Sequence, residues 1–189
     1  MDINARIAAR VSALRQERGM SLDALATKCN VSRSMISLIE RGQSSATAVI
    51  LEKLATGLGV LLSSLFEDQQ PQANPLIRHR DQPEWRDPQS KYLRRDISPP
   101  NTQSPIRIVE VLFPAGARVA YETAAREIRV QQQIWMLDGS IDVTVGTTQY
   151  ALDTGDCLAF PLNQPTAFHN PHSKQARYAV VLSTDAPTT

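Results

Sequence analysis

Apolar residues recur at helical spacing along the first third of the chain, with polar residues on the opposite faces. Ile7 and Leu14 belong to one such stripe, and Ile36 and Ile39 belong to another. Short polar segments that contain Ser, Asn, Thr or Gly separate the stripes, as expected where helices begin and end. The pattern predicts five short helices within residues 1–66, packed into one small domain.

The spacing between residues 21 and 42 predicts two short helices that cross at a steep angle. Ser21 and Ser32 are suited to cap them, because a serine hydroxyl accepts hydrogen bonds from the free amides of a first helical turn. Asn30 and Gly42 are suited to end them, since both residue types tolerate a left-handed backbone. Such a pair is a helix-turn-helix, whose second helix reads the major groove of DNA.

After the helical part the pattern changes to extended segments. Short β-branched or aromatic runs are separated by Pro, Gly, Asp and Asn, which is typical of an antiparallel sandwich or barrel. The runs lie at residues 106–113, 131–137, 140–145, 156–160 and 177–182. Asp138 and Gly139, between two of these runs, predict a hairpin turn. Residues 67–75 contain acids, glutamines and two prolines without apolar periodicity, and they are predicted to be a linker.

The length and charge distribution agree with two domains of different function. The 189 residues fit a helical domain at 1–66 and a β domain at 76–189. The net charge is +1, but residues 1–66 carry eight basic and five acidic side chains, a net charge of +3, whereas the remainder carries −2. A positive head on a nearly neutral body is consistent with binding to phosphates.

Other features of the sequence favour a cytoplasmic protein. It contains no run of 18 apolar residues, and its first residues, MDINARIAAR, lack the apolar core of a signal peptide. We therefore expect no membrane partner. Cys29 and Cys157 fall in different predicted domains, so we expect reduced thiols and no disulfide.

Residues 3–66 resemble the Xre family of lambda-repressor-like DNA-binding domains. The resemblance is carried by the wording I-x-x-I-E-R-G at residues 36–42. It implies that the second motif helix and the loop after it contact DNA, through Ser32, Arg33, Ser34, Ser37, Arg41, Gln43 and Ser44. The family commonly has Gln at the first position of the first motif helix, where this chain has Leu22, so base readout is expected to rest more on Arg33 and Ser34. The alternative is that residues 32–34 are only a solvated polar face.

Two later segments, residues 114–139 and 155–170, resemble the two motifs of the cupin family. The residues that fall into register are Gly116, Gly139, Gly155, Pro161 and Asn170. The resemblance implies an all-β double-stranded β-helix, the jelly-roll barrel of cupins. Together with the five-helix lambda-repressor-like head, it gives a two-domain fold.

The metal ligands of the cupin motifs are missing from this sequence. Glu122 and Ala124 stand at the two histidine positions, Gln132 at the glutamate position and Thr166 at the last histidine position. A tight divalent site needs several imidazole and carboxylate donors that converge. We therefore expect no metal, no other cofactor and no enzymatic activity.

The barrel interior is predicted to hold a small molecule instead. Glu122, Gln132 and Thr166 are its candidate polar anchors, and Ile134 and Met136 its apolar walls, because strand alternation places residues 132, 134 and 136 on one face. The alternative is a filled barrel that only dimerises.

These features predict a sequence-specific transcriptional regulator. It is expected to bind a roughly palindromic double-stranded DNA operator as a homodimer, and its barrel is expected to dimerise and to sense a small-molecule effector that acts on the heads through the linker. Two alternatives stay open: a cupin enzyme, an oxygenase or isomerase, with an accessory head, and a DNA-binding protein whose barrel serves only protein interaction.

Overall fold

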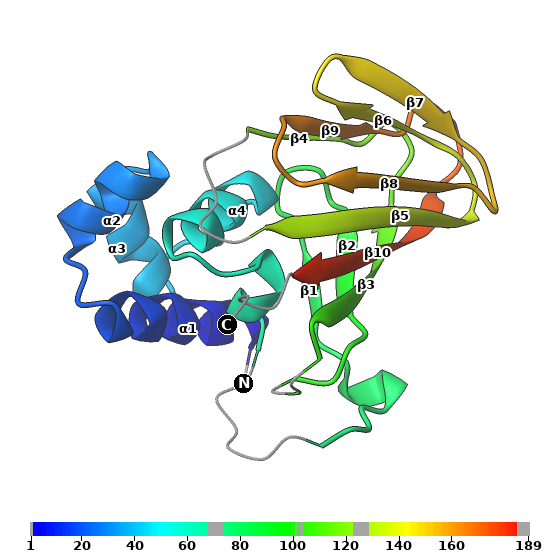
Figure 1. Cartoon of the computed structure of the whole chain (residues 1–189). Coiled ribbons are helices and arrows are strands. Elements are labelled where there is room, and N and C mark those ends of the chain that lie inside the picture. The colour runs from blue at the N-terminus through cyan, green and yellow to red at the C-terminus, as the bar shows by residue number, and fades with distance from the viewer. Residues whose placement is uncertain (1, 68–73, 101, 103, 123–128, 185–189) are drawn as a thin grey trace.

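The helical head and the β domain lie side by side in the computed structural model, which describes residues 2–67, 74–100, 102, 104–122 and 129–184 (Figure 1). In this part of the chain the head contains α1 (Ile3–Glu17), α2 (Leu22–Cys29), α3 (Arg33–Glu40), α4 (Ala48–Gly57) and the 3-10 helix η1 (Leu62–Leu65). The predicted fold class of the head is confirmed. Its fifth element is a single 3-10 turn rather than an α-helix.

The head helices begin where the sequence predicts. Ser21 Oγ accepts a hydrogen bond from the amide of Ala24 at 3.1 Å, and Ser32 Oγ accepts one from Met35 at 3.2 Å. These bonds satisfy amides that have no partner within their own helix. Asn30, which ends α2, has φ 51° and ψ 48°, the left-handed conformation expected for this exit.

The β domain consists of two antiparallel sheets. The large sheet contains, in spatial order, β1 (Glu84–Arg86), β2 (Leu93–Asp96), β3 (Ile106–Phe113), β10 (Ala176–Thr184), β5 (Val130–Asp138) and β8 (Cys157–Pro161). The small sheet contains β4 (Arg118–Tyr121), β9 (Thr166–His169), β6 (Ile141–Val145) and β7 (Thr148–Leu152). A short 3-10 helix, η2 (His79–Asp81), precedes β1. All five runs predicted from the sequence form strands, and the two sheets make the predicted cupin barrel.

The hairpin predicted at Asp138 and Gly139 is wrong. The strand that ends there, β5, pairs with β10 and β8, whereas β6, which follows, pairs with β7 and β9 in the other sheet. The chain therefore turns a corner between the sheets. Gly139 has φ +77°, and a Cβ there would lie 3.1 Å from the backbone of Ala176. Glycine is required by the close approach of these segments as well as by the backbone angle.

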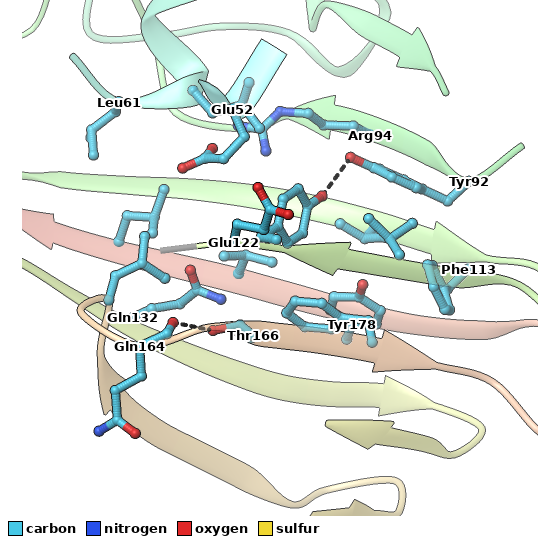
Figure 2. Close-up of a pocket in the computed structure, with 18 residues that line it drawn as sticks. Glu52, Leu61, Tyr92, Arg94, Phe113, Glu122, Gln132, Gln164, Thr166 and Tyr178 are labelled. Carbon is cyan, nitrogen blue, oxygen red and sulfur yellow. Dashed lines mark hydrogen bonds between the residues drawn. The ribbon is translucent and has the colours of Figure 1, made fainter. Parts of the chain in front are cut away.

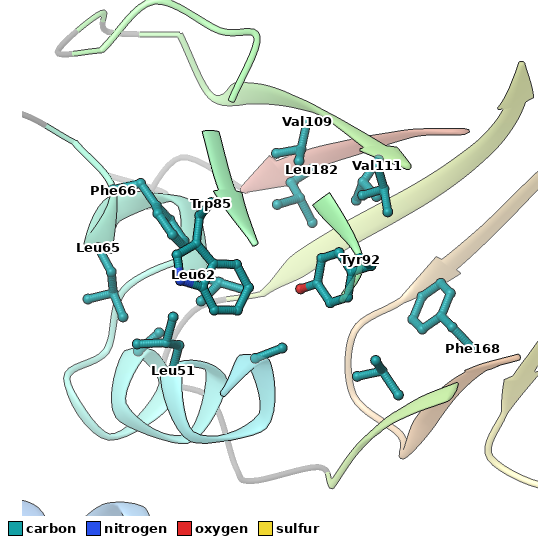
Figure 3. Close-up of a cluster of buried hydrophobic side chains, with 14 of the residues drawn as sticks. Leu51, Leu62, Leu65, Phe66, Trp85, Tyr92, Val109, Val111, Phe168 and Leu182 are labelled. Atoms are coloured by element: carbon teal, nitrogen blue, oxygen red, sulfur yellow. The ribbon is translucent and has the colours of Figure 1, made fainter. Parts of the chain in front are cut away.

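Head and barrel share one continuous hydrophobic core. Phe66 of the head packs against Trp85 of β1 with ring centroids 5.7 Å apart, and the chain of rings continues through Tyr92 to Phe113 inside the barrel, with spacings of 5.9 Å. Figure 3 shows Leu51 and Leu62 of the head beside Trp85 of the barrel. The segment that joins the domains is described only at residues 67, 74 and 75, so the predicted linker lies mostly outside the described residues. Contacts with the barrel hold the head, among them the packing of Phe66 on Trp85 and the bond between Lys53 and Glu122.

A buried carboxylate adds a polar link between the two domains. Asp87, which follows β1, is 2% exposed, and its Oδ1 accepts a hydrogen bond of 2.8 Å from the amide of Ala48, the first residue of α4. Its Oδ2 accepts two bonds of 2.6 Å from the amide and hydroxyl of Ser90. A negative charge at a helix N-terminus is favourable, because the free amides of the first turn point toward it. The barrel therefore caps a helix of the head.

Candidate functional sites

The recognition helix α3 presents a polar N-terminus to solvent. Ser32, Arg33 and Ser34 are exposed, whereas Ile36 and Ile39 on the opposite face are buried against the rest of the head. This division follows from the helical spacing, which places residues 36 and 39 on one face. Three of the candidate DNA-contacting residues are therefore together on one accessible surface.

The side chains of this surface are only lightly engaged. The hydroxyl of Ser32 caps α3 and lies 3.2 Å from the hydroxyl of Ser34. Arg33 Nε is 3.2 Å from Asp23 Oδ1 of α2, and both side chains are more than half exposed. An exposed ion pair of this kind contributes little stability. Arg33 can therefore exchange Asp23 for a DNA partner at small cost.

The remaining DNA-contacting candidates flank this surface. Arg41 and Gln43 are exposed after the end of α3, and Ser37 and Ser44 are half-buried. The hydroxyl of Ser44 lies 4.0 Å from the sulfur of Met35. All seven candidates belong to α3, its cap or the loop after it, and their contacts with DNA stay a prediction.

Two features of the helices around α3 affect the helix-turn-helix: the side chain of Leu22 and an ion pair between α1 and α3. Leu22, the first residue of α2, is half-buried and packs against the core, so it offers no polar group to DNA. Arg15 of α1 donates to both oxygens of Glu40 in α3, at 2.7 and 2.8 Å, and to the carbonyl of Met20 at 2.8 Å. The hydrogen bond to Glu40 raises the pKa of Arg15. This bidentate pair fixes α3 to α1, and sequence reasoning missed it, although its Glu belongs to the E-R-G wording.

A cavity opens where α4 and η1 meet the barrel. Its cavity volume is about 90 Å³. The head supplies Glu52, Leu61 and Leu62 to its lining. The barrel supplies Tyr92, Arg94, Val111, Phe113, Val119, Tyr121, Glu122, Gln132, Leu162, Gln164, Thr166, Phe168, Tyr178, Val180 and Leu182 (Figure 2). A largely apolar lining with a few polar groups is typical of small-molecule sites.

The structure brings the three predicted polar anchors together in this cavity. Glu122 lies at its mouth, and Gln132 and Thr166 lie inside. Ile134 and Met136 are buried, at 0% and 1% exposure, but do not line the cavity. They share the inward face of β5 with Gln132 and lie further along the strand, where the two sheets close on each other.

Two buried polar residues, Gln132 and Tyr178, line the cavity. The amide of Gln132 is in a residue 7% exposed, and the hydroxyl of Tyr178 is in a residue 4% exposed. Tyr92 and Tyr121 pair their hydroxyls at 3.3 Å. Because their amide and hydroxyl line the cavity, Gln132 and Tyr178 are candidate contacts for a ligand or water. Sequence reasoning missed the three tyrosines, since Tyr121 and Tyr178 lie on strands, where an aromatic residue is equally suited to the core.

The buried tyrosines are expected to make the protein lose stability in alkaline solution. Burial raises the pKa of Tyr92 to about 12 from an ordinary value of 10.0. The native chain thus retains a proton that the unfolded chain releases, so the contribution of this group is full below pH 10 and is lost as the pH rises toward 12. Denaturant titrations between these pH values should show the loss, and Tyr92→Phe should reduce it. Tyrosinate absorbance that rises fully near pH 10 in the native protein would contradict the expectation.

The residues at the cupin metal positions do not fit a divalent ion. Glu122 Oε2 is 2.8 Å from Lys53 Nζ of α4, Gln132 offers a neutral amide, and the hydroxyl of Thr166 donates to the carbonyl of Gln164 at 3.2 Å. The position predicted for Ala124 lies outside the described residues. Within the described ranges, no group of three or more His, Cys, Asp and Glu is placed to hold a metal. A neutral amide, a hydroxyl and one carboxylate that already pairs with Lys53 are poor ligands for such an ion.

The cupin residues that do match the motif serve the scaffold. Asn170 is fully buried, its amide donates to the carbonyls of Phe113 and Lys174 at 3.2 and 2.8 Å, and its Oδ1 accepts from the amide of His172 at 3.0 Å. Gly116, with φ +71°, donates its amide to the carbonyl of Asn170 at 2.8 Å. These bonds join the first cupin segment, residues 114–139, to the second, residues 155–170. Separately, no helix in the described segments has the length and apolar character needed to cross a bilayer.

A helix-turn-helix head with an exposed recognition helix, joined to a cupin barrel, defines a DNA-binding transcriptional regulator. Residues 11–65 match the HTH_3 helix-turn-helix family. The HTH-type transcriptional regulator SutR of Escherichia coli (strain K12) is 30% identical over 158 residues, which are 83% of each chain. The chain belongs to this family of HTH-type transcriptional regulators.

Two further relatives agree with this assignment. A crystal structure of an HTH_3 family transcriptional regulator from Vibrio cholerae has a TM-score of 0.79 at 25% identity, and the match covers 97% of this chain and 98% of that one. Control protein C.MunI of Mycoplasma sp is 37% identical over 68 residues, 35% of this chain and 92% of its own length. The first relative spans head and barrel, and the second matches over a length close to that of one head.

Proposed function

We propose that this regulator binds a two-fold symmetric operator as a homodimer and that a small-molecule effector, bound in the cavity beneath α4, controls the binding. The observation that carries the proposal is that head and barrel line one cavity together. A ligand there touches α4 and η1 directly, so it can favour one arrangement of the head over another through its differential affinity for the two.

The homodimer follows from the size of the DNA-binding surface. A single recognition helix reads only a few base pairs, and a two-fold pair of helices that reads two half-sites about one helical turn apart supplies the missing specificity. Sedimentation of the free protein and of its complex with a cognate operator tests this step. Two chains per operator are expected, and one chain per operator at saturation would contradict the homodimer.

We infer that the chain acts on DNA in the cytoplasm and that its barrel binds rather than catalyses. The uncharged amide, hydroxyls and aromatic rings of the cavity support binding, and neither a nucleophile paired with a base nor a metal donor set is present among the lining residues.

The effector is expected to be retained by the full chain and lost when the anchors are removed. Native mass spectrometry of the purified protein, together with a thermal-shift screen, should find a small ligand for the wild type. A triple variant with Glu122→Gln, Gln132→Leu and Thr166→Val should fold and lose that ligand, because it removes polar contacts without adding bulk. Operator binding measured with and without the ligand should differ by about five-fold or more, the usual range of coupling between two sites. A broad screen without a ligand would favour a barrel that only dimerises.

A further inference from the structure

The walls of the cavity are suited to a cation. Five aromatic rings line it, and among them Phe168 and Tyr178 stack with their planes 3° apart, while Tyr121 meets Phe168 edge-on at 6.2 Å. The faces of such rings carry a negative quadrupole that attracts ammonium groups. Aromatic walls alone would also hold a neutral ring, so the charges at the mouth decide the class of ligand.

Two carboxylates stand at the mouth. Glu52 comes from α4 of the head and Glu122 from the end of β4, and Figure 2 shows both beside the opening above Gln132. Burial is the main cause that raises the pKa of the hydroxyls of Tyr92 and Tyr121; the charge of Arg94 lowers the pKa of Tyr92, and the charge of Glu52 is a smaller contribution that raises both. The negative charge of Glu52 therefore acts directly on groups inside the cavity.

The positive group of the lining is already engaged. Arg94 is 6% exposed, its Nη2 donates to Asp96 at 2.9 Å, and its guanidinium lies 5.1 Å from the ring centroid of Phe66. Asp96 balances its charge and Phe66 covers it. Among the described residues, the lining of the cavity therefore contains two carboxylates and one guanidinium, and Asp96 pairs with the guanidinium.

An ammonium group of the chain already occupies this mouth. Lys53 Nζ of α4 lies 2.8 Å from Glu122 Oε2, and the Glu122 side chain is 78% exposed, so a ligand can reach it. We propose, on the basis of the proposed function, that the effector is a small organic cation whose ammonium replaces Lys53 at Glu122. Its apolar body lies against the aromatic walls and Gln132 bonds its inner end. Binding then releases Lys53, and with it a direct bond between α4 of the DNA-binding head and the barrel.

A matched series of probes tests the charge preference on the full chain. 2-Phenylethylamine, 2-phenylethanol and phenylacetate share one body and differ in charge. At neutral pH and fixed ionic strength, calorimetry or a thermal shift should show the amine binding about ten-fold tighter than the alcohol, with the acid weakest. Equal affinity of the amine and the alcohol would overturn the proposal. So would tightest binding of the acid, which would assign the cavity to anions through Arg94, whose buried Nε has no hydrogen-bond partner in the described structure.

Two exposed or half-exposed positions separate a ligand contact from a structural effect. Glu122→Gln should reduce amine affinity to near that of the alcohol and leave the alcohol unchanged. Lys53→Gln should raise amine affinity several-fold, because the ligand then meets no competing ammonium, and a merely structural role for Lys53 would give no such gain. Gln132→Leu should weaken all three probes. Unchanged amine affinity in both Glu122→Gln and Lys53→Gln would exclude exchange at this site.

The outcome is distinguishable from a failure of the proposed function. These affinities are measured without DNA, so selective amine binding supports the ligand class even if operator binding does not respond. Conversely, a neutral or anionic molecule that changes operator binding would keep the sensor function and overturn the ligand class.

Discussion

Asp87→Ala is expected to lower the free energy of unfolding by about 3 kcal/mol. The substitution removes a buried carboxylate that accepts three hydrogen bonds, and it leaves the amide of Ala48, in a residue 1% exposed, without its partner. A bond to a charged group contributes about 1.5 to 3 kcal/mol, and a buried donor left unpaired costs about 1 to 3 kcal/mol. Chemical denaturation followed by tryptophan fluorescence measures the loss, since Trp85 lies at the junction that Asp87 holds.

Two variants control this experiment. Asp81→Ala removes an acidic side chain that is more than half exposed, and it should change stability by less than about 0.5 kcal/mol. Asp87→Asn keeps one acceptor for Ala48 and should lose less than Asp87→Ala. If Asp87→Ala were as stable as Asp81→Ala, the barrel would not cap α4 in solution.

Arg33→Ala is expected to weaken specific operator binding by about 1 to 3 kcal/mol, because an arginine that bonds a guanine edge discriminates by that amount. The side chain is exposed at the N-terminus of α3, and among the described residues its one ion pair is the exposed pair with Asp23, so its removal should leave stability nearly unchanged. Fluorescence anisotropy with the operator and with scrambled DNA, at one salt concentration, separates specific from nonspecific loss.

The matched control for Arg33 is Arg118→Ala, an exposed arginine on β4 of the barrel. It removes the same charge far along the chain from the recognition helix, so any shared loss reports net charge alone. Asp23→Asn should bind DNA at least as tightly as the wild type, because it frees Arg33 and removes a negative charge from the surface. Equal losses in Arg33→Ala and Arg118→Ala would remove Arg33 from base readout.

The parts of the fold that the sequence predicts are those set by local chemistry. Ser21, Ser32 and Asn30 act as caps because a hydroxyl or a left-handed exit suffices, whatever lies around them. The five long β-branched runs form strands because their alternation matches a half-buried sheet. Short strands such as β1, β2 and β4 carry three or four residues, too few for alternation to stand out.

The contacts that cross between the two domains could not be predicted from the sequence. Asp87 caps a helix that begins 39 residues earlier, and Lys53 meets Glu122 across the same junction. Neither pair has a spacing that a periodicity reveals. Because the sequence does not reveal these contacts, it led us to expect that an effector acts through the linker. In the structure, Leu61 and Leu62 of the head line the cavity itself, so a ligand there would touch the head directly.

The chain of aromatic rings from Phe66 to Phe113 has a consequence for the operator. Because the head is packed against its barrel and not only tethered to it, the position of the recognition helix is fixed relative to the barrel. In the proposed homodimer, the barrel-to-barrel contact then sets the distance between the two recognition helices. The β domain therefore determines how many base pairs separate the half-sites that the dimer can bind. A ligand that rotates the head by a few degrees relative to the barrel changes that number.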